Sequence, residues 1–398
     1  MTQNKPGRSA AFTMPPMSTS PLKIDQPTAL LGGLSATQFM RRYWHKKPLL
    51  IRQAMPGVQP PATRADLFAL AAQDDVESRL IVRETPQSDS DWTLRRGPIP
   101  RRALPKLDRP GWTLLVQGLD LHLESARALL EPFRFVPDAR LDDLMISYAT
   151  DGGGVGPHFD SYDVFLLQVH GTRRWRIGRL PNPELRPDVP LKILTNFEPE
   201  HEWVLEPGDM LYLPPGWAHD GIAEGECMTC SVGFRSPSRT ELAREVLVRL
   251  LEAAETPEGD PIYRDPKQDA TTEPGRMPAH YQAFAAEAVA KLLQRDPHAF
   301  DKALGEYLSE PKEGVWFSPV EVSLHGQGLR LDRRTRMMYD DRHIYVNGES
   351  WRAAGADARL MKKLADRREL TPQDWQRASP DAQELLTQWA EDGWLHPV

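Results

Sequence analysis

Cysteine is nearly absent from this chain of 398 residues, in which only Cys227 and Cys230 occur. Two cysteines exclude a disulfide-stapled scaffold and a zinc domain built from several thiolates. The pair does form the spacing C-x-x-C, which acts as a redox motif at the start of a helix that follows a strand. Here it lies in the segment 226–234, which has the pattern of a strand, and strand positions three apart face opposite sides of a sheet. A redox function for the two cysteines is therefore not expected.

Long apolar runs are also missing. No stretch approaches the roughly 18 apolar residues of a transmembrane helix, so no membrane association is predicted. Residues 1–22 are small, polar and proline-containing, and they lack the apolar core of about 7–15 residues that a signal peptide carries. We therefore expect a disordered N-terminal tail and a cytoplasmic location.

An excess of positive charge is missing as well. The chain has 49 Lys and Arg against 56 Asp and Glu, which gives a formal net charge of −7. Proteins that bind nucleic acid over a broad face usually carry a basic balance, so direct nucleic-acid binding is not expected. A basic partner suits this charge better.

The region 143–235 is the most informative part of the chain. Proline is abundant, 37 of 398 residues, which indicates many stiff turns. Several short strands follow one another between Gly and Pro turns, with no helical period among them, which predicts a sandwich or barrel. These expected strands cover residues 144–148, 163–170, 173–177, 192–194, 202–205, 210–213 and 228–234.

The flanking regions have a different character. Helices are expected near residues 35–44, 64–73 and 121–134 before the strand-rich block, and over 238–252 and 279–310 after it. From residue 313, short strands mix with helices in the order of a winged-helix-like module. We therefore expect a disordered tail (1–33), a β-rich catalytic domain (34–237), an α-helical region (238–312) and a winged-helix-like domain (313–398).

A candidate metal site begins with His158-Phe-Asp160, because positions i and i+2 of a strand point to the same face. His219, at the end of Leu211-Tyr-Leu-Pro-Pro-Gly-Trp-Ala-His219, supplies a third ligand. Two histidines and one carboxylate form the facial triad of non-haem Fe(II) oxygenases, which leaves open positions for a co-substrate and dioxygen. The same set also suits catalytic zinc.

Arg173 is a candidate partner for an organic acid. In the segment 171–175, strand alternation puts Arg173 on the face of Trp175 and Arg174 on the opposite face. We expect the face with Trp175 to point inward, and a buried arginine needs an anionic partner. A dicarboxylate could chelate the metal at one end and pair bidentately with Arg173 at the other. The alternative is a surface arginine in a basic run.

Further polar residues surround these positions. Thr229 and Ser231 share one face of the last strand, where they would bind co-substrate, substrate or water; an outward polar face is the alternative. An acidic, aromatic mouth for a cationic side chain could form around the metal motif, unless the first two of its residues merely make a solvated turn. This expected mouth comprises Asp142, Asp143, Tyr148, Tyr162 and Asp163.

Together, the motifs H-x-D, G-T-R-R-W and E-P-G-D-M-L-Y-L-P-P-G-W-x-H closely resemble those of the JmjC-type, cupin-like 2-oxoglutarate oxygenases. Within this class the chain resembles the bacterial ribosomal oxygenases, which hydroxylate an arginine of a large-subunit ribosomal protein. Further matches lie at 43–48, 142–148, 152–158 and 162–165, and the resemblance extends over nearly the whole chain from about residue 34. It implies an α+β protein with a double-stranded β-helix (jelly-roll) domain, a helical dimerisation segment and a C-terminal winged-helix-like domain.

The resemblance also implies roles for single residues. His158, Asp160 and His219 would bind Fe(II), and Arg173 would meet the distal carboxylate of 2-oxoglutarate. Asp143, Met145 and Tyr162 would line the pocket of the target arginine, with Asp143 as its salt-bridge partner. To these we add Thr229 on the co-substrate and Ser231 on the substrate, and we expect no catalytic residue beyond the metal site.

The implied reaction consumes dioxygen and 2-oxoglutarate, and releases succinate and carbon dioxide as the ribosomal protein is hydroxylated by a homodimeric enzyme. A histidine-directed relative would share the same iron ligands. Two rival functions stay open at this point. A cupin enzyme without a redox step, using zinc or manganese, would not need oxygen. A ligand-sensing regulator would bind DNA through its winged-helix-like end.

Overall fold

The computed structural model describes residues 22–84, 92–253, 261–267, 269–270, 275–294, 298–324 and 326–398. Most of the expected tail, residues 1–21, lies outside the described residues. Its end is structured, because Ala29–Leu31 form a 3-10 helix in which Leu30 and Leu31 are buried. The chain divides into two compact units, one that ends at Ser236 and one that begins at Pro237. Among the described residues, no helix is both long and apolar enough to cross a membrane.

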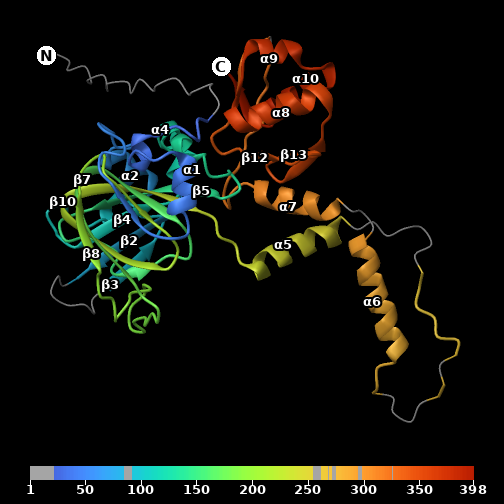
Figure 1. Cartoon of the computed structure of the whole chain (residues 1–398), viewed down its shortest axis with the longest axis horizontal. Helices are drawn as coiled ribbons and strands as arrows, with labels where there is room; N and C mark the ends of the chain where they lie inside the picture. Colours follow the sequence, from blue (N-terminus) through green and yellow to red (C-terminus); the bar gives the residue numbers. More distant parts are fainter. Residues whose placement is uncertain are drawn as a thin grey trace. The chain divides into compact units, whose positions relative to one another are not determined.

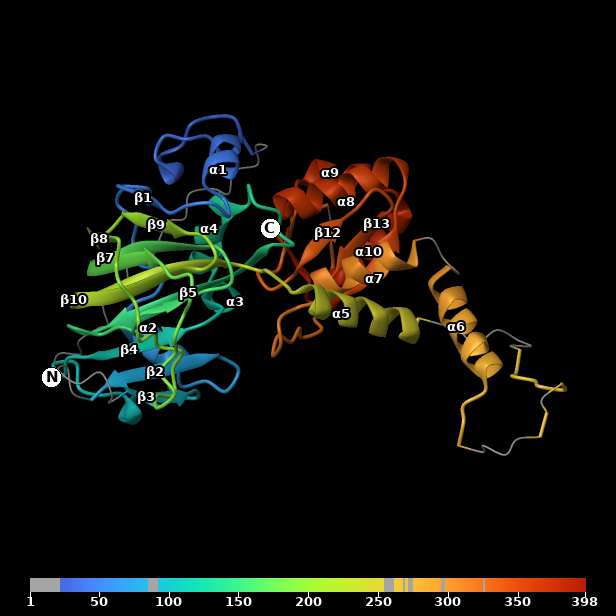
Figure 2. The ribbon, with the colours of Figure 1, turned by 60° about the horizontal axis from the view of Figure 1, so that its bottom comes forward.

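The first unit is built on a curved antiparallel sheet with the strand order β1-β9-β7-β10-β5-β4-β2-β3, in which β6 adds to β10 and β8 to β7 (Figures 1 and 2). The expected jelly-roll architecture is confirmed. The strands are β1 (Leu49–Ile51), β2 (Ser78–Arg83), β3 (Trp92–Arg96), β4 (Trp112–Val116), β5 (Leu141–Ala149), β6 (His158–Phe159), β7 (Val164–Arg179), β8 (His201–Leu205), β9 (Met210–Leu213) and β10 (Trp217–Phe234).

The long strands β7 and β10 pair along most of their length and form the centre of this sheet. The sequence predicted two strands at 163–170 and 173–177, whereas β7 runs through both. Gly171 allows this, since its φ is +60° and a Cβ there would lie 2.1 Å from the carbonyl oxygen of Glu226 on β10. The predicted strand at 192–194 is wrong, because Leu194 makes only an isolated bridge to Leu185.

Short helices cover the first unit at its edges. α1 (Ala36–Arg42) is capped by Ser35, whose hydroxyl accepts from the Gln38 N–H, and α2 (Arg64–Leu70) follows. The predicted helix at 121–134 is broken into α3 (Leu119–His122), α4 (Glu124–Leu130) and a 3-10 turn, because Leu123 has an extended backbone. The larger core packs Phe39, Phe165 and Tyr212 together.

In the described part of the second unit, a run of helices precedes a small mixed domain (Figure 1). These helices are α5 (Arg239–Glu252), α6 (Ala279–Gln294) and α7 (Ala299–Ser309). Ala303 of α7 packs against Val246 and Leu250 of α5. On another side, α7 approaches the mixed domain so closely that a Cβ on Gly305 would lie 2.2 Å from the ring of Tyr345. The helical and winged-helix-like regions therefore share one compact unit.

The mixed domain has the predicted winged-helix character, with Leu386 and Trp389 in its core. Asn347 and Gly348 both have positive φ and form a tight hairpin turn. Its strands are β11 (Leu329–Leu331), β12 (Met337–Tyr339), β13 (His343–Val346), β14 (Glu349–Arg352), β15 (Glu369–Leu370) and β16 (Leu395–Pro397), and its helices are α8 (Gly355–Arg367), α9 (Pro372–Arg377) and α10 (Pro380–Glu391).

Candidate metal and co-substrate site

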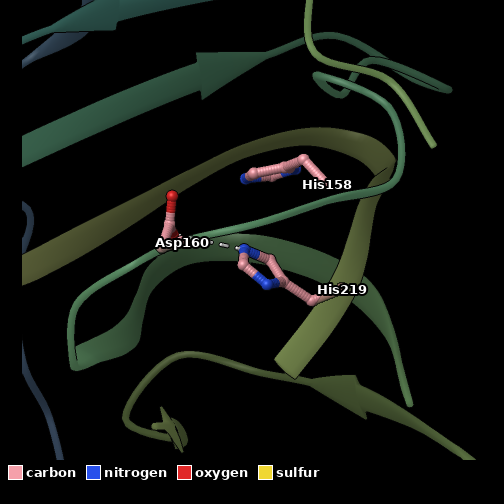
Figure 3. A group of neighbouring side chains, drawn as sticks. All are labelled: His158, Asp160 and His219. Atoms are coloured by element: carbon pink, nitrogen blue, oxygen red, sulfur yellow. Dashed lines mark ion pairs between the residues drawn. The ribbon is translucent and has the colours of Figure 1, made fainter. Parts of the chain in front are cut away.

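The three predicted metal ligands come together in the first unit (Figure 3). The short strand β6 pairs with β10 so that His158 lies opposite His219. Asp160 follows directly after β6 and lies just outside the strand. One ligand atom from each residue lies within 4.8 Å of the others, and His219 Nε2 is 3.7 Å from Asp160 Oδ2. This spacing allows one ion to contact all three side chains.

Backbone carbonyls orient both imidazoles. His158 Nδ1 lies 2.9 Å from the carbonyl oxygen of Gly156, and His219 Nδ1 lies 3.0 Å from that of Trp217. A carbonyl can only accept, so Nδ1 carries the proton in each ring and Nε2 presents its lone pair. Burial, and then the nearby His158, lower the pKa of His219 to about 4. His219 is therefore neutral at physiological pH, as a metal ligand must be.

Glycines fix the loop that leads to His158. A Cβ on Gly153 would lie 2.5 Å from the carbonyl oxygen of Trp112, and a Cβ on Gly154 would lie 2.6 Å from that of Gly221. The loop therefore lies against two strands at a distance that only glycine permits. The Leu194 N–H also donates to the carbonyl of Pro157 at 2.8 Å, which holds the residue before the first ligand.

Arg173 lies on the same face of the β7–β10 pair as His219. Arg173 is paired with Ala223, four residues along β10 from His219. Arg173 is 4% exposed, and its Nε and Nη2 atoms are buried with no hydrogen-bond partner among the residues that the structure describes. Arg174 instead forms ion pairs on the exposed face with Glu202 and Glu224. The alternation is as predicted, and the unpartnered Nε and Nη2 form the side-on fork that fits a carboxylate.

Thr229 and Ser231 are both buried on β10, so the alternative of an outward polar face is not what the structure has. The Thr229 hydroxyl donates to Gln168 Oε1 at 2.7 Å, and Gln168 Nε2 donates to the carbonyl of His170. Ser231 lies opposite Met145 of β5. Gln168 was missed by the sequence analysis, although a polar residue in the apolar run 164–169 is a signal for an inward polar contact.

Two of the residues predicted to line the target pocket, Asp143 and Tyr162, lie near the same end of β10. A Cβ on Gly233 would lie 3.7 Å from Asp143 Oδ1 and 4.0 Å from Tyr162 Cε2, so both side chains flank this glycine. Asp143 Oδ2 accepts from Gln117 Nε2 at 2.7 Å and from the Gly118 N–H at 2.8 Å. Desolvation of its hydroxyl, and then the carboxylates of Asp160 and Asp143, raise the pKa of Tyr162, although the residue as a whole is 39% exposed. The Tyr162 hydroxyl therefore interacts electrostatically with both Asp160 and Asp143.

The surroundings of this pocket contain residues that the sequence analysis did not single out. Arg79 Nη2 lies 3.1 Å from Gln117 Oε1 and 4.0 Å from Met145 Sδ. Neither Arg79 nor Gln117 belongs to a motif, and only strand pairing brings them to Asp143.

Two members of the expected acidic mouth are not at the mouth. Tyr148 is fully buried beside Phe68 and Trp112. Asp163 is also fully buried, and it accepts a hydrogen bond from the Tyr212 hydroxyl. Their closeness in sequence to the metal motif was misleading, because strand alternation and the turn after β6 send them into the core. The two cysteines are buried and unpaired, and burial raises the pKa of Cys230.

Comparison with known proteins agrees with this geometry. The family model of the JmjC domain matches residues 128–242, and that of the ROXA-like winged helix matches residues 291–396. A His-Asp-His cluster on a jelly-roll sheet, followed by such a winged helix, defines a JmjC-type oxygenase with a C-terminal module.

Individual relatives identify one family within this class. The ribosomal protein uL16 3-hydroxylase of Escherichia coli (strain K12) is 35% identical over 339 residues, which cover 79% of this chain and 85% of that protein. The X-ray structure of E. coli YcfD matches with a TM-score of 0.78 at 30% identity, over 91% of this chain and 98% of that chain. A structure of YcfD, a ribosomal oxygenase, in complex with cobalt and 2-oxoglutarate matches over the same shares with a TM-score of 0.75 at 30% identity. The chain belongs to the ribosomal oxygenase family.

Proposed function

We propose that this protein is an Fe(II)- and 2-oxoglutarate-dependent dioxygenase that hydroxylates an arginine side chain of a large-subunit ribosomal protein. The observation that carries the proposal is the buried, unpartnered fork of Arg173 on the face of the His158, Asp160 and His219 cluster. A burial this complete is costly for an unpaired cation, so the site is built for an anion. A dicarboxylate that reaches a metal at one end and Arg173 at the other satisfies both groups.

In this proposal His158, Asp160 and His219 hold the iron and leave its remaining positions open. Bound iron supplies the activation of dioxygen and the oxidation of an unactivated C–H bond. Arg173 binds the distal carboxylate of 2-oxoglutarate, and Thr229 lines the co-substrate side. The protein's own contribution is to orient the reacting carbon and to exclude water.

The pocket around Asp143 supports an arginine as the target. Asp143 is 3% exposed, and its Oδ2 accepts hydrogen bonds from Gln117 Nε2 and the Gly118 N–H, which hold the carboxylate in place. A buried carboxylate beside the ring of Tyr162 suits a planar guanidinium, which pairs with carboxylates and stacks on aromatic rings. Met145 and Ser231 would line the rest of this pocket. The substrate in the E. coli relative's name is a ribosomal protein, which supports the same class of substrate here.

The second unit supports a homodimer as the working form. Helix α5 leaves Leu247, Val248 and Leu251 exposed, with Leu251 at 61%. Three neighbouring apolar side chains on one helix favour burial against another protein surface. We assign that surface to a second copy of this chain. Residues 34–237 would then be catalytic, 238–312 would dimerise, and 313–398 would form the winged-helix-like domain. Such an enzyme would work in the cytoplasm, without direct binding of nucleic acid.

Succinate formation tests the proposed chemistry. Purified protein with Fe(II), dioxygen, ribosomal proteins and 2-oxoglutarate should release succinate, and His219→Ala should abolish the release. Arg173→Ala should raise the 2-oxoglutarate requirement steeply, because the distal carboxylate loses its partner. Arg174→Ala, next along the strand but on the exposed face, is the matched control and should leave the requirement unchanged. Full turnover in His219→Ala, or turnover without oxygen, would contradict the proposal.

A further inference from the structure

Three buried hydrogen-bond donors on one face of β7 have no acceptor within the described residues. Two are Nε and Nη2 of Arg173, and the third is Nε1 of Trp175, two residues further along the same face. Buried polar groups in folded proteins are nearly always hydrogen-bonded, because leaving one unpaired is costly. Three orphaned donors in one place therefore indicate a bound molecule with several acceptor atoms.

Trp175 lies between the candidate metal ligands and Arg173. Its indole ring is 5.9 Å from the imidazole of His219, and the Arg173 guanidinium carbon is 5.7 Å from the indole ring. The strand register agrees, since His219, Gly221 and Ala223 of β10 pair with Ile177, Trp175 and Arg173 of β7. Any molecule that spans from the metal ligands to Arg173 must pass along this ring.

The orientation of the ring leaves its N–H available. A Cβ on Gly221 would lie 2.6 Å from Cζ3 and Cη2 of Trp175 and 2.9 Å from Cε3. The benzene edge of the indole therefore rests on Gly221, and only glycine permits so close a contact. Nε1 is on the opposite edge, directed away from β10. Trp175 itself is 5% exposed, so bulk water does not satisfy this donor.

We propose that Trp175 is a further co-substrate-binding residue, whose indole N–H donates to the same carboxylate of 2-oxoglutarate that the Arg173 fork binds. This inference rests on the proposed function. The two parallel bonds from Arg173 use one lone pair on each carboxylate oxygen, and the second lone pair of one oxygen accepts from Trp175. The ring forms the wall along the carbon chain between this carboxylate and the metal. Trp175 thus selects for an acid with a distal carboxylate.

Binding measurements on the Mn(II)-loaded protein test the inference without requiring turnover. Isothermal titration calorimetry compares 2-oxoglutarate with 2-oxopentanoate, which has the same chain length but a methyl group in place of the distal carboxylate. Trp175→Phe retains the buried ring and removes only the N–H. Its affinity for 2-oxoglutarate should fall about tenfold or more, the range for a hydrogen bond to a charged group. Its affinity for 2-oxopentanoate should stay within about twofold of the wild-type value, because this acid has no distal carboxylate that could accept from the indole N–H.

Trp203→Phe is the matched control, because Trp203 lies opposite Trp175 on β8. This variant should bind both acids like the wild type. An equal loss for both acids in Trp175→Phe would mean a packing role and would overturn the inference, as would no loss at all. Failure of the wild type to bind 2-oxoglutarate would instead refute the proposed function.

A second measurement serves if Trp175→Phe does not fold. In the wild-type protein loaded with Zn(II), the indole N–H signals of its 11 tryptophans can be followed by NMR. One signal should shift on addition of 2-oxoglutarate and stay in place with 2-oxopentanoate. If no signal distinguishes the two acids, the inference is wrong.

Discussion

Replacing Arg173 with methionine should make the ligand-free protein more stable while it removes 2-oxoglutarate binding. Arg173 is 4% exposed, and its Nε and Nη2 have no hydrogen-bond partner within the described residues. Methionine retains most of the buried alkyl stem but carries no charge. The ligand-free fold is therefore relieved of an unpaired buried cation, whereas the co-substrate loses its main partner.

The size of this effect follows from the two orphaned donors. Each unsatisfied buried donor costs about 1–3 kcal/mol, so the free energy of unfolding should rise by about 2 kcal/mol in Arg173→Met. For a unit of this size, about 2 kcal/mol corresponds to a melting temperature about 4–8 °C higher. Wild type should recover this deficit on binding, because a ligand at 100 times its dissociation constant stabilises by about 2.7 kcal/mol.

The order of the two melting temperatures should therefore reverse when 2-oxoglutarate is added. Differential scanning calorimetry of the Mn(II)-loaded proteins should show Arg173→Met melting higher without the acid, and wild type melting at least as high with it. Arg174→Met is the control; its ion pairs lie on the exposed face, so its stability should change by less than about 1 kcal/mol. A lower melting temperature for Arg173→Met without ligand would show that Arg173 does not destabilise the ligand-free fold. An unchanged response to 2-oxoglutarate would show that Arg173 does not bind this acid.

Three further outcomes are expected. Gly221→Ala should destabilise the first unit by about 1–3 kcal/mol in urea unfolding, because its Cβ would meet the Trp175 ring at 2.6 Å; an unchanged midpoint would mean that the ring moves freely. In the second unit, burial acts to raise the pKa of Asp332, but hydrogen bonds, first from Arg334, lower it to about 2. This carboxylate therefore stabilises the fold above about pH 4, and its contribution is lost as the pH falls toward 2. Asp332→Asn should cost roughly 1–2 kcal/mol at pH 7, with the difference from wild type vanishing near pH 2; a pH-independent difference would contradict the assignment. Leu251→Glu should convert a dimer into monomers in light scattering, and a monomeric wild type would refute the homodimer.

The metal cluster could be predicted from the sequence because short motifs determine local geometry. His158 and Asp160 are two residues apart, and His219 enters β10 directly after a rigid proline turn. Arg173 could be placed on the inward face because alternation along a strand needs no tertiary information. The JmjC and winged-helix modules carry equally local patterns, and both are present.

Contacts that depend on strand pairing were beyond the sequence. Gln117 and Arg79 reach Asp143 and Met145 only because β4 lies between β2 and β5 in the sheet. The burial of Asp163 likewise depends on Tyr212, which is far away along the chain. Closeness in sequence suggested a surface role for this carboxylate, whereas the register of β7 and β9 directs it into the core.

Mass spectrometry of ribosomal proteins would detect the proposed hydroxylation itself. Ribosomal proteins from unmodified ribosomes would be incubated with the purified protein, Fe(II) and dioxygen, with and without 2-oxoglutarate. We expect one arginine-containing peptide of a large-subunit protein to gain one oxygen atom only when 2-oxoglutarate is present. An unchanged peptide set, with no consumption of 2-oxoglutarate, would contradict the assignment of this site to a ribosomal oxygenase reaction.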